Sequence, residues 1–104
     1  MAWTVLIISG VLEAVWATAL GRSDGLSRLV PSVVFAMALV VSMIGLAYAM
    51  RELPVGTSYA VWVGIGATLT VVYAMLSGDQ QFSWSSALFL AMIVGGVVGL
   101  KAVH

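Results

Sequence analysis

Hydrophobic residues fill four long stretches of the chain, and short polar connections separate them. The stretches run over residues 2–20, 29–50, 57–76 and 84–103. Each is close to the roughly 20 apolar residues that an α-helix needs to cross the hydrocarbon core of a bilayer. The pattern predicts an all-α membrane protein with four transmembrane helices, in a single domain over residues 1–104.

The connections combine turn-forming and charged residues, as loops at a membrane surface do. They cover residues 21–25, 51–56 and 77–81, and we expect their carboxylates, Asp24, Glu52 and Asp79, to be solvated. Because each loop is only a handful of residues long, consecutive helices are expected to be antiparallel neighbours. The loops leave no room for an extramembrane domain, so we expect the protein to act within the bilayer.

Composition narrows the class further. The chain is 62% hydrophobic and only 8% charged, which excludes a soluble domain with a wet surface. Its net charge of zero gives no basic field for nucleic acid, and the absence of cysteine excludes disulfides and thiolate chemistry. The single His104 has no partner ligands, so neither a metal nor a cofactor is expected. Residues 1–4 carry no Lys or Arg, which argues against a cleaved signal peptide.

The basic residues are divided evenly between the two membrane sides. Arg51 and Lys101 fall on one side, and Arg22 and Arg28 on the other. The positive-inside rule then gives no preferred orientation. A chain that inserts both ways can form a dimer of oppositely oriented copies, the two-chain counterpart of the inverted repeats of larger transporters. Four charges can also be too few to carry a topological signal, so both interpretations stay open.

Glu13 is the only charged residue inside the first apolar stretch. An ionised carboxylate in hydrocarbon costs several kcal/mol, so it must face a wet cavity, pair with another group or take up a proton. Gly10, Glu13 and Ala17 share one helix face, with Trp16 beside it, and the small residues leave space for a guest or a neighbouring helix. The alternative is a packing glutamate that bonds a hydroxyl across the bundle.

Three polar or aromatic residues of the second and third stretches are further candidates. Ser42 lies at about the depth of Glu13 and can donate a hydrogen bond to it, or bond back to its own preceding turn. Tyr59 and Trp62 are spaced i, i+3. The phenol can bond a carboxylate, and the indole can offer a π face to a cation or its N–H to an acceptor. A core or lipid-facing aromatic pair is the alternative.

Small residues mark two other helix positions. Gly64 and Gly66 weaken the third helix and permit a kink, which suits an element that bends between two states. Ala91, Gly95 and Gly99 form a small-xxx-small pattern that allows close approach of another helix, so we expect the fourth helix to be a dimer contact.

With these residues placed, the whole chain resembles the small multidrug resistance family of four-helix exporters. The resemblance rests on Glu13, on Arg-Leu-Val-Pro-Ser at 28–32, and on the run Leu-Pro-Val-Gly-Thr-Ser-Tyr-Ala-Val-Trp-Val-Gly-Ile-Gly at 53–66. Within the family it resembles the guanidinium-exporter branch. That closer likeness is carried by Gly10, Trp16 and Ser42.

Three positions depart from that branch. Gly21 stands where a basic residue is common, and the loop at 77–81 lacks the usual Glu-Pro-like turn. Both changes touch loops and should not alter the chemistry. Met43 stands where an aromatic is common. It neighbours Ser42 and therefore bears on the breadth of substrates accepted.

The resemblance implies a proton-coupled antiporter in the plasma (inner) membrane that exports guanidinium, and small substituted guanidiniums, by alternating access. It implies an antiparallel homodimer in which both copies of Glu13 bind substrate and protons in turn. Trp16 and Ser42 would orient the carboxylate, and Tyr59 and Trp62 would line the cavity. The chemistry suits the residues, because a carboxylate can accept two parallel N–H bonds from planar guanidinium.

Two other functions remain open. The first is export of quaternary ammonium or aromatic cations, which need more adaptable walls than a hydrogen-bonded carboxylate provides. The second is a non-transporting membrane subunit in which Glu13 only joins helices, although the short loops offer a partner little surface. An enzyme is disfavoured because no second catalytic group accompanies the carboxylate. The even charge division favours a second copy of the chain over a paralogue as the partner.

Overall fold

The structure, a computed structural model, describes residues 1–78 and 80–103. Its elements are α1 (Ala2–Arg22), α2 (Leu29–Met50), α3 (Val55–Ser77) and α4 (Trp84–Ala102), and the described residues contain no strand. Each helix is long and apolar enough to cross a membrane. The predicted fold class, an all-α multi-pass membrane protein with four spans, is confirmed. The expectations for Asp79 and His104 lie outside the described residues.

The helix ends differ from the predicted ones by one or two residues, for local reasons. α1 continues through Gly21 to Arg22, whose guanidinium lies 5.5 Å from the centre of the Tyr73 ring in α3. α3 begins at Val55, where the Pro54 carbonyl accepts the first helical bond from the Ser58 N–H at 2.9 Å. α4 begins after Ser83, whose hydroxyl accepts from the Ser86 N–H at 3.0 Å, a typical N-cap.

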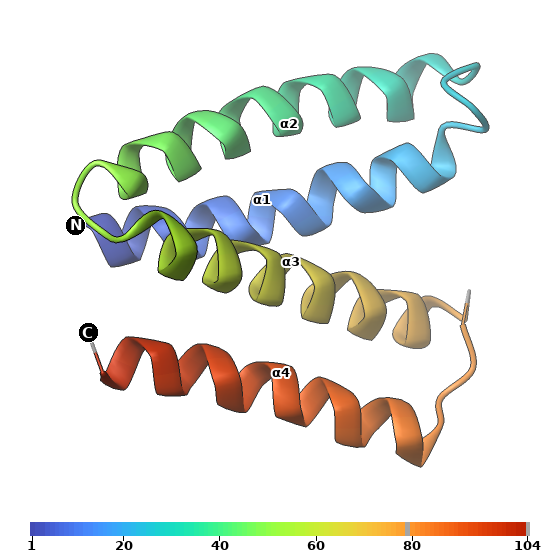
Figure 1. The fold of residues 1–104 in the computed structure, drawn as a ribbon. Coiled ribbons are helices and arrows are strands. Elements are labelled where there is room, and N and C mark those ends of the chain that lie inside the picture. The colour runs from blue at the N-terminus through green and yellow to red at the C-terminus, as the bar shows by residue number, and fades with distance from the viewer. Residues whose placement is uncertain (79, 104) are drawn as a thin grey trace.

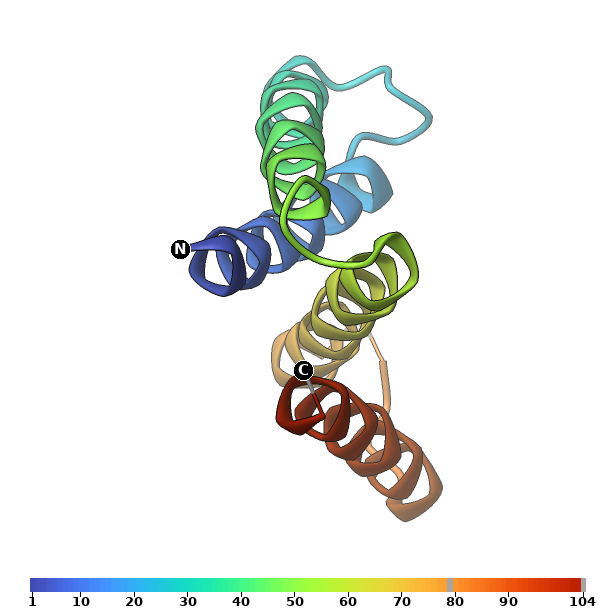
Figure 2. The ribbon, with the colours of Figure 1, turned by 60° about the vertical axis from the view of Figure 1, so that its left-hand side comes forward.

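The four helices form an open layer with α1 in its interior (Figures 1 and 2). α1 packs against α2 on one side and α3 on the other, and α4 packs against α3, so the order across the layer is α2, α1, α3, α4. α2 and α3 are consecutive but touch little, because α1 lies between them. The Cα trace measures 41 × 34 × 17 Å, and a single helix with side chains is already about 10 Å wide. The chain is therefore not a closed bundle.

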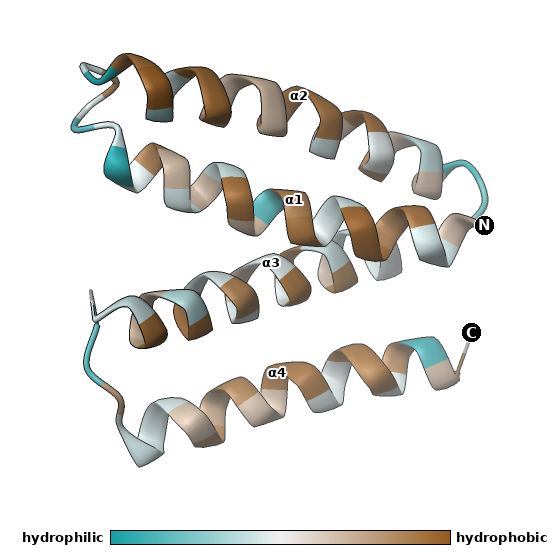
Figure 3. Ribbon diagram, turned by 180° about the vertical axis from the view of Figure 1, so that it is seen from behind, coloured by the Kyte–Doolittle hydropathy of each residue, from teal (hydrophilic) through white to brown (hydrophobic). Residues whose placement is uncertain are grey.

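The buried residues gather where α1, α2 and α3 meet. The buried hydrophobic cluster consists of Leu6, Leu46, Ala49, Val61 and Trp62. By contrast, none of the described residues of α4 is buried. Figure 3 shows hydrophobic colour along all four helices and hydrophilic colour in the connections, with one hydrophilic interruption in the middle of α1 where Glu13 lies. Glu13 lies where α1 contacts α3.

Candidate functional site

Glu13 projects from the middle of α1 against the backbone of α3 at Gly66. A Cβ built on Gly66 would overlap the Oε1 atom of Glu13 and would lie 2.8 Å from its Cγ. One turn earlier on α1, a Cβ on Gly10 would lie 2.8 Å from Cγ2 of Ile65. A glycine on each helix thus removes side-chain volume where the two helices cross, as close helix approach in membranes requires.

The carboxylate of Glu13 lacks a donor within the described chain. Its Oε1 atom is buried and has no hydrogen-bond partner among the described residues. Leaving a buried acceptor unpaired costs roughly 1–3 kcal/mol, and more for a charged group. The site therefore has the chemistry to accept a bond from a proton donor or a cationic guest.

Ser42 connects three helices through one hydroxyl group. The hydroxyl donates to the Ser9 carbonyl of α1 at 2.8 Å and accepts from the Nε1–H of Trp62 in α3 at 3.0 Å. We predicted that Ser42 can donate to Glu13, but its single proton is used by Ser9, so that donation is absent from this arrangement. The Ser9 carbonyl is the backbone acceptor four residues before Glu13, so Ser42 acts on the turn that carries the carboxylate.

Four aromatic rings continue from this hydrogen bond across the site. The Trp62 ring lies 6.4 Å from Trp16 and 6.0 Å from Tyr59, between ring centroids. Trp16 also meets Phe35 of α2 edge-on at 5.9 Å. Trp62 is buried, whereas Tyr59 remains 55% exposed and the buried Nε1–H of Trp16 has no partner among the described residues. The predicted residues Trp16, Ser42, Tyr59 and Trp62 thus come together beside the Glu13 turn.

Phe35, Gly45 and Ser9 also belong to this region and were not predicted as site residues. Phe35 precedes Ser42 by seven residues and Gly45 follows it by three, so Phe35, Ser42 and Gly45 share one face of α2. A Cβ on Gly45 would overlap the Oγ atom of Ser9, which shows that this glycine lets α1 approach α2. Their helical spacing from Ser42 could have predicted that Phe35 and Gly45 lie on the same face of α2 as Ser42.

Gly64 and Gly66 of α3 occupy two different environments. The helix is continuous from Val55 to Ser77 through both of them. A Cβ on Gly64 would lie 2.6 Å from Cγ2 of Val97 in α4, whereas Gly66 faces Glu13 in α1. Close packing thus accounts for each glycine, and the kink at this pair stays a prediction.

The small residues of the α4 stripe face away from the rest of the described chain. Ala91, Gly95 and Gly99 are exposed, and a Cβ on either glycine would meet no described atom within 4 Å. α4 contacts α3 through Val97 and Ile93 instead. The predicted role of the stripe in a dimer stays a prediction.

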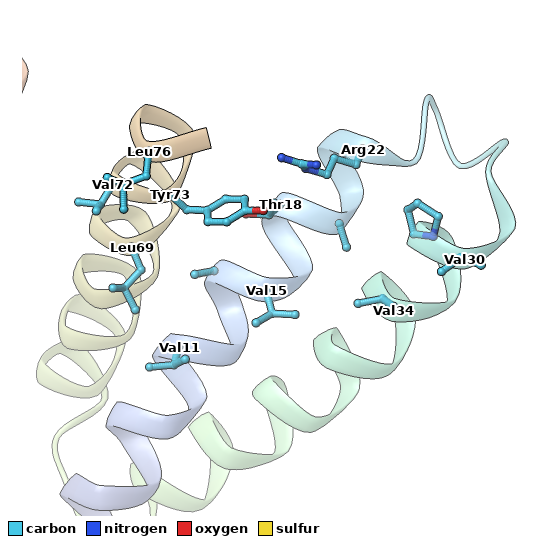
Figure 4. Close-up of a pocket in the computed structure, with 13 residues that line it drawn as sticks. Val11, Val15, Thr18, Arg22, Val30, Val34, Leu69, Val72, Tyr73 and Leu76 are labelled. Carbon is cyan, nitrogen blue, oxygen red and sulfur yellow. The ribbon is translucent and has the colours of Figure 1, made fainter. Parts of the chain in front are cut away.

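A groove of about 630 Å³ lies over the face of α1 that carries Val11 and Val15 (Figure 4). Glu13 is two residues from each of these valines, so its side chain points to the other side of the helix. α1 forms its floor, and α2 and α3 form its walls. Aliphatic side chains such as Val11, Val15 and Leu69 line most of it, and Arg22 and Tyr73 meet at one end. Within the described chain, none of the predicted site residues lines this groove. It is therefore separate from the Glu13 site.

Four helices able to span a membrane, with a glutamate in the middle of α1 whose buried Oε1 has no hydrogen-bond partner among the described residues, define a multi-pass membrane protein. The chain belongs to the small multidrug resistance family, because the family model described as Small Multidrug Resistance protein matches residues 1–93. The predicted family is confirmed. Among the described residues there is no group of three His, Cys, Asp or Glu side chains able to hold a metal.

Curated relatives cover nearly the whole chain. It is 46% identical over 101 residues to a guanidinium exporter of Yersinia pseudotuberculosis, covering 97% of both chains. It is 46% identical to a guanidinium exporter of Salmonella typhimurium, covering 97% of this chain and 96% of that one. A guanidinium exporter of Proteus vulgaris is 45% identical with 97% of both covered. The chain is accordingly a membrane transporter and not an enzyme.

Proposed function

We propose that this protein is a proton-coupled antiporter that exports guanidinium, with Glu13 binding the cation and protons in turn. The observation that carries the proposal is the buried Oε1 of Glu13, which has no hydrogen-bond partner among the described residues. A guest with N–H donors satisfies that oxygen and neutralises its charge at once. The names of the relatives, guanidinium exporters at 45–46% identity, support the same substrate.

The walls of the site favour a small planar cation. Guanidinium offers several N–H donors in one plane and stacks on aromatic faces, which Trp16, Trp62 and Tyr59 supply. Trp16 is packed between Phe35 and Trp62, so it occupies space that a bulky guest would need. A quaternary ammonium ion has no N–H donor and would leave the carboxylate oxygen unpaired. These features favour guanidinium over quaternary ammonium.

Exchange of cation for protons follows from the charge of the site. An empty, ionised carboxylate within the bilayer is costly, and either a bound cation or a bound proton removes that cost. If the protein changes access only when the site is neutralised, protons entering from outside drive the cation out. Alternating access would then couple the two fluxes without any further ionisable group in the helices.

The open shape of the chain supports an antiparallel homodimer. The layer is only 17 Å thick, and α4 buries none of its described residues. In the small stripe, Ala91 is exposed, and a Cβ on Gly95 or Gly99 would meet no described atom within 4 Å. A second copy would cover these surfaces, with lipid around both, and would bring a second Glu13 to a shared cavity. The even division of basic residues lets the two copies insert in opposite orientations.

Transport by the purified chain in liposomes tests the proposal. Guanidinium and a tetraalkylammonium ion are offered separately, and proton movement is followed. Glu13→Gln should abolish guanidinium-driven proton movement, whereas Glu52→Gln, a matched change of the chain's other glutamate at an exposed loop position, should not. Silence with both cations in a folded dimer contradicts the transporter, and full activity of Glu13→Gln contradicts the role of the carboxylate. A response to tetraalkylammonium alone supports the multidrug alternative.

A further inference from the structure

Gly64 and Gly66 of α3 face different kinds of atoms. A Cβ on Gly64 would meet aliphatic carbons of Val97 and Ile93 in α4. A Cβ on Gly66 would meet only carboxylate-end atoms of Glu13 among its three nearest neighbours: Oε1, Cδ and Cγ. Gly66 is therefore a contact of the functional group itself, and a shared role of the pair in helix bending does not explain this difference.

Two contacts on the N-terminal side of Gly66 hold the spacing of α1 and α3. On the preceding residue, Ile65 already packs into the space that Gly10 leaves. One turn earlier, the Nε1–H of Trp62 bonds Ser42, which in turn bonds the Ser9 carbonyl of α1. The helices cannot separate locally without breaking these contacts. A side chain added at Gly66 must therefore displace the flexible end of Glu13, because the backbone is less free to move.

The Gly66 backbone donates no hydrogen bond to the Oε1 atom of Glu13. The Gly66 carbonyl is an acceptor, and it accepts a hydrogen bond from the Thr70 hydroxyl at 2.7 Å. The Oε1 atom thus lies against the Cα of Gly66 with its acceptor capacity unused. This position keeps one carboxylate oxygen buried without neutralising it.

We propose that Gly66 is a positioning residue for Glu13: because Gly66 has no side chain, it leaves the space in which the carboxylate lies against α3. Its effect on cation binding rests on the proposed function, but its effect on the position of the carboxylate does not. A helix hinge at the Gly64–Gly66 pair is a different hypothesis: it places both glycines in one role and predicts equal effects of their substitution.

Two alanine variants separate these hypotheses. Gly66→Ala fills the space of the carboxylate. The matched control is Gly64→Ala combined with Val97→Ala, which stiffens the same helix and removes the Cγ2 atom that the new Cβ would strike. Both variants lose one glycine of the pair, and only the first touches Glu13.

Carboxyl ¹³C NMR reads the carboxylate position without any substrate. The chain has only two glutamates, Glu13 and Glu52, and Glu13→Gln assigns their signals. We expect Gly66→Ala to move the Glu13 signal and leave the Glu52 signal unchanged, while the control variant moves neither. An unmoved Glu13 signal in folded Gly66→Ala, or an equal shift in the control variant, overturns the proposal.

Guanidinium titrations of the same samples give the functional reading. Gly66→Ala should weaken binding by about tenfold or more, the loss of roughly one good hydrogen bond, while the control variant stays near the parent. Equal weakening in both variants overturns the proposal in favour of the hinge. If the parent chain itself binds no guanidinium, the proposed function fails, and the NMR comparison still decides the role of Gly66.

A stability cycle covers the case in which Gly66→Ala folds poorly. Glu13→Ala removes the Cγ, Cδ and Oε1 atoms that the new Cβ would overlap. The drop in melting temperature caused by Gly66→Ala should therefore be much smaller in the Glu13→Ala background than in the parent. An equal drop in both backgrounds shows that the added methyl strikes something other than the carboxylate and overturns the proposal.

Discussion

α1 presents two opposite faces that differ in packing and in chemistry. On one face, Gly10 and Glu13 meet α3 so closely that even an added methyl group finds no space. The other face forms the floor of the groove of about 630 Å³, where Val11 and Val15 are more than 40% exposed. On the face that packs against α3, the size and polarity of each residue therefore matter, whereas the groove face needs only to be apolar.

The largest expected difference between the faces comes from their polar groups. Glu13→Gln removes the charge that we propose binds the cation, so transport should fall to the level of empty liposomes. Thr18→Val removes a hydroxyl from the groove face and should leave transport within about twofold of the parent, since surface-type changes cost little. Liposome flux measures both. Comparable losses in the two variants would mean that the groove face also takes part in transport.

The next largest effect is expected from adding side-chain volume to the close-packed face and to the open groove face of α1. Gly10→Leu forces a side chain into the position of Ile65, and such overpacking costs about 1–3 kcal/mol. Val11→Leu adds one methylene to the open groove at the adjacent position and should cost less than about 0.5 kcal/mol. Unfolding in mixed micelles with increasing SDS measures the free energies. If both variants have the same free energy of unfolding, the Gly10 face of α1 is not as closely packed against α3 as the structure indicates.

A similar loss is expected where Ser42 connects α1, α2 and α3. Ser42→Ala leaves the Trp62 indole N–H without its acceptor and should destabilise the fold by about 1–3 kcal/mol. Ser32→Ala is the matched control, because Ser32 is partly exposed and bonds only the Arg28 carbonyl before its own helix. The same unfolding assay measures both, with indole fluorescence as a second readout. A stable Ser42→Ala variant with unchanged fluorescence would contradict the three-helix connection.

The smallest effect is expected at the end of the groove. Tyr73→Leu removes the ring under the Arg22 guanidinium and should cost about 0.5–1 kcal/mol, whereas Tyr73→Phe keeps the ring and the stability. Neither change should alter guanidinium transport, because the groove lies on the other face of α1. Liposome flux and SDS unfolding check this pair. If Tyr73→Phe is stable but transports poorly, the groove face of α1 also takes part in transport.

Much of the fold was predictable because membrane insertion depends on local properties. The length and hydropathy of a segment decide whether it spans the bilayer, and these are read directly along the chain. The helix ends therefore fall within one or two residues of the predicted ones. Glu13 was equally easy to single out as a candidate functional residue, because a carboxylate is costly inside an apolar membrane span and is rare there without a function. The sequence also predicted Trp16, Ser42, Tyr59 and Trp62 as site residues, and the structure brings these four side chains together.

The contacts between helices were not readable in the same way. The acceptor of the Ser42 proton, the placement of Phe35 beside Trp16 and the contact of Gly66 with Glu13 all depend on how each helix is rotated about its axis. In a soluble helix an apolar stripe reveals that rotation. Here lipid and protein interior are both apolar, so the sequence carries no such stripe, and only the packing of α1, α2 and α3 decides which residues meet.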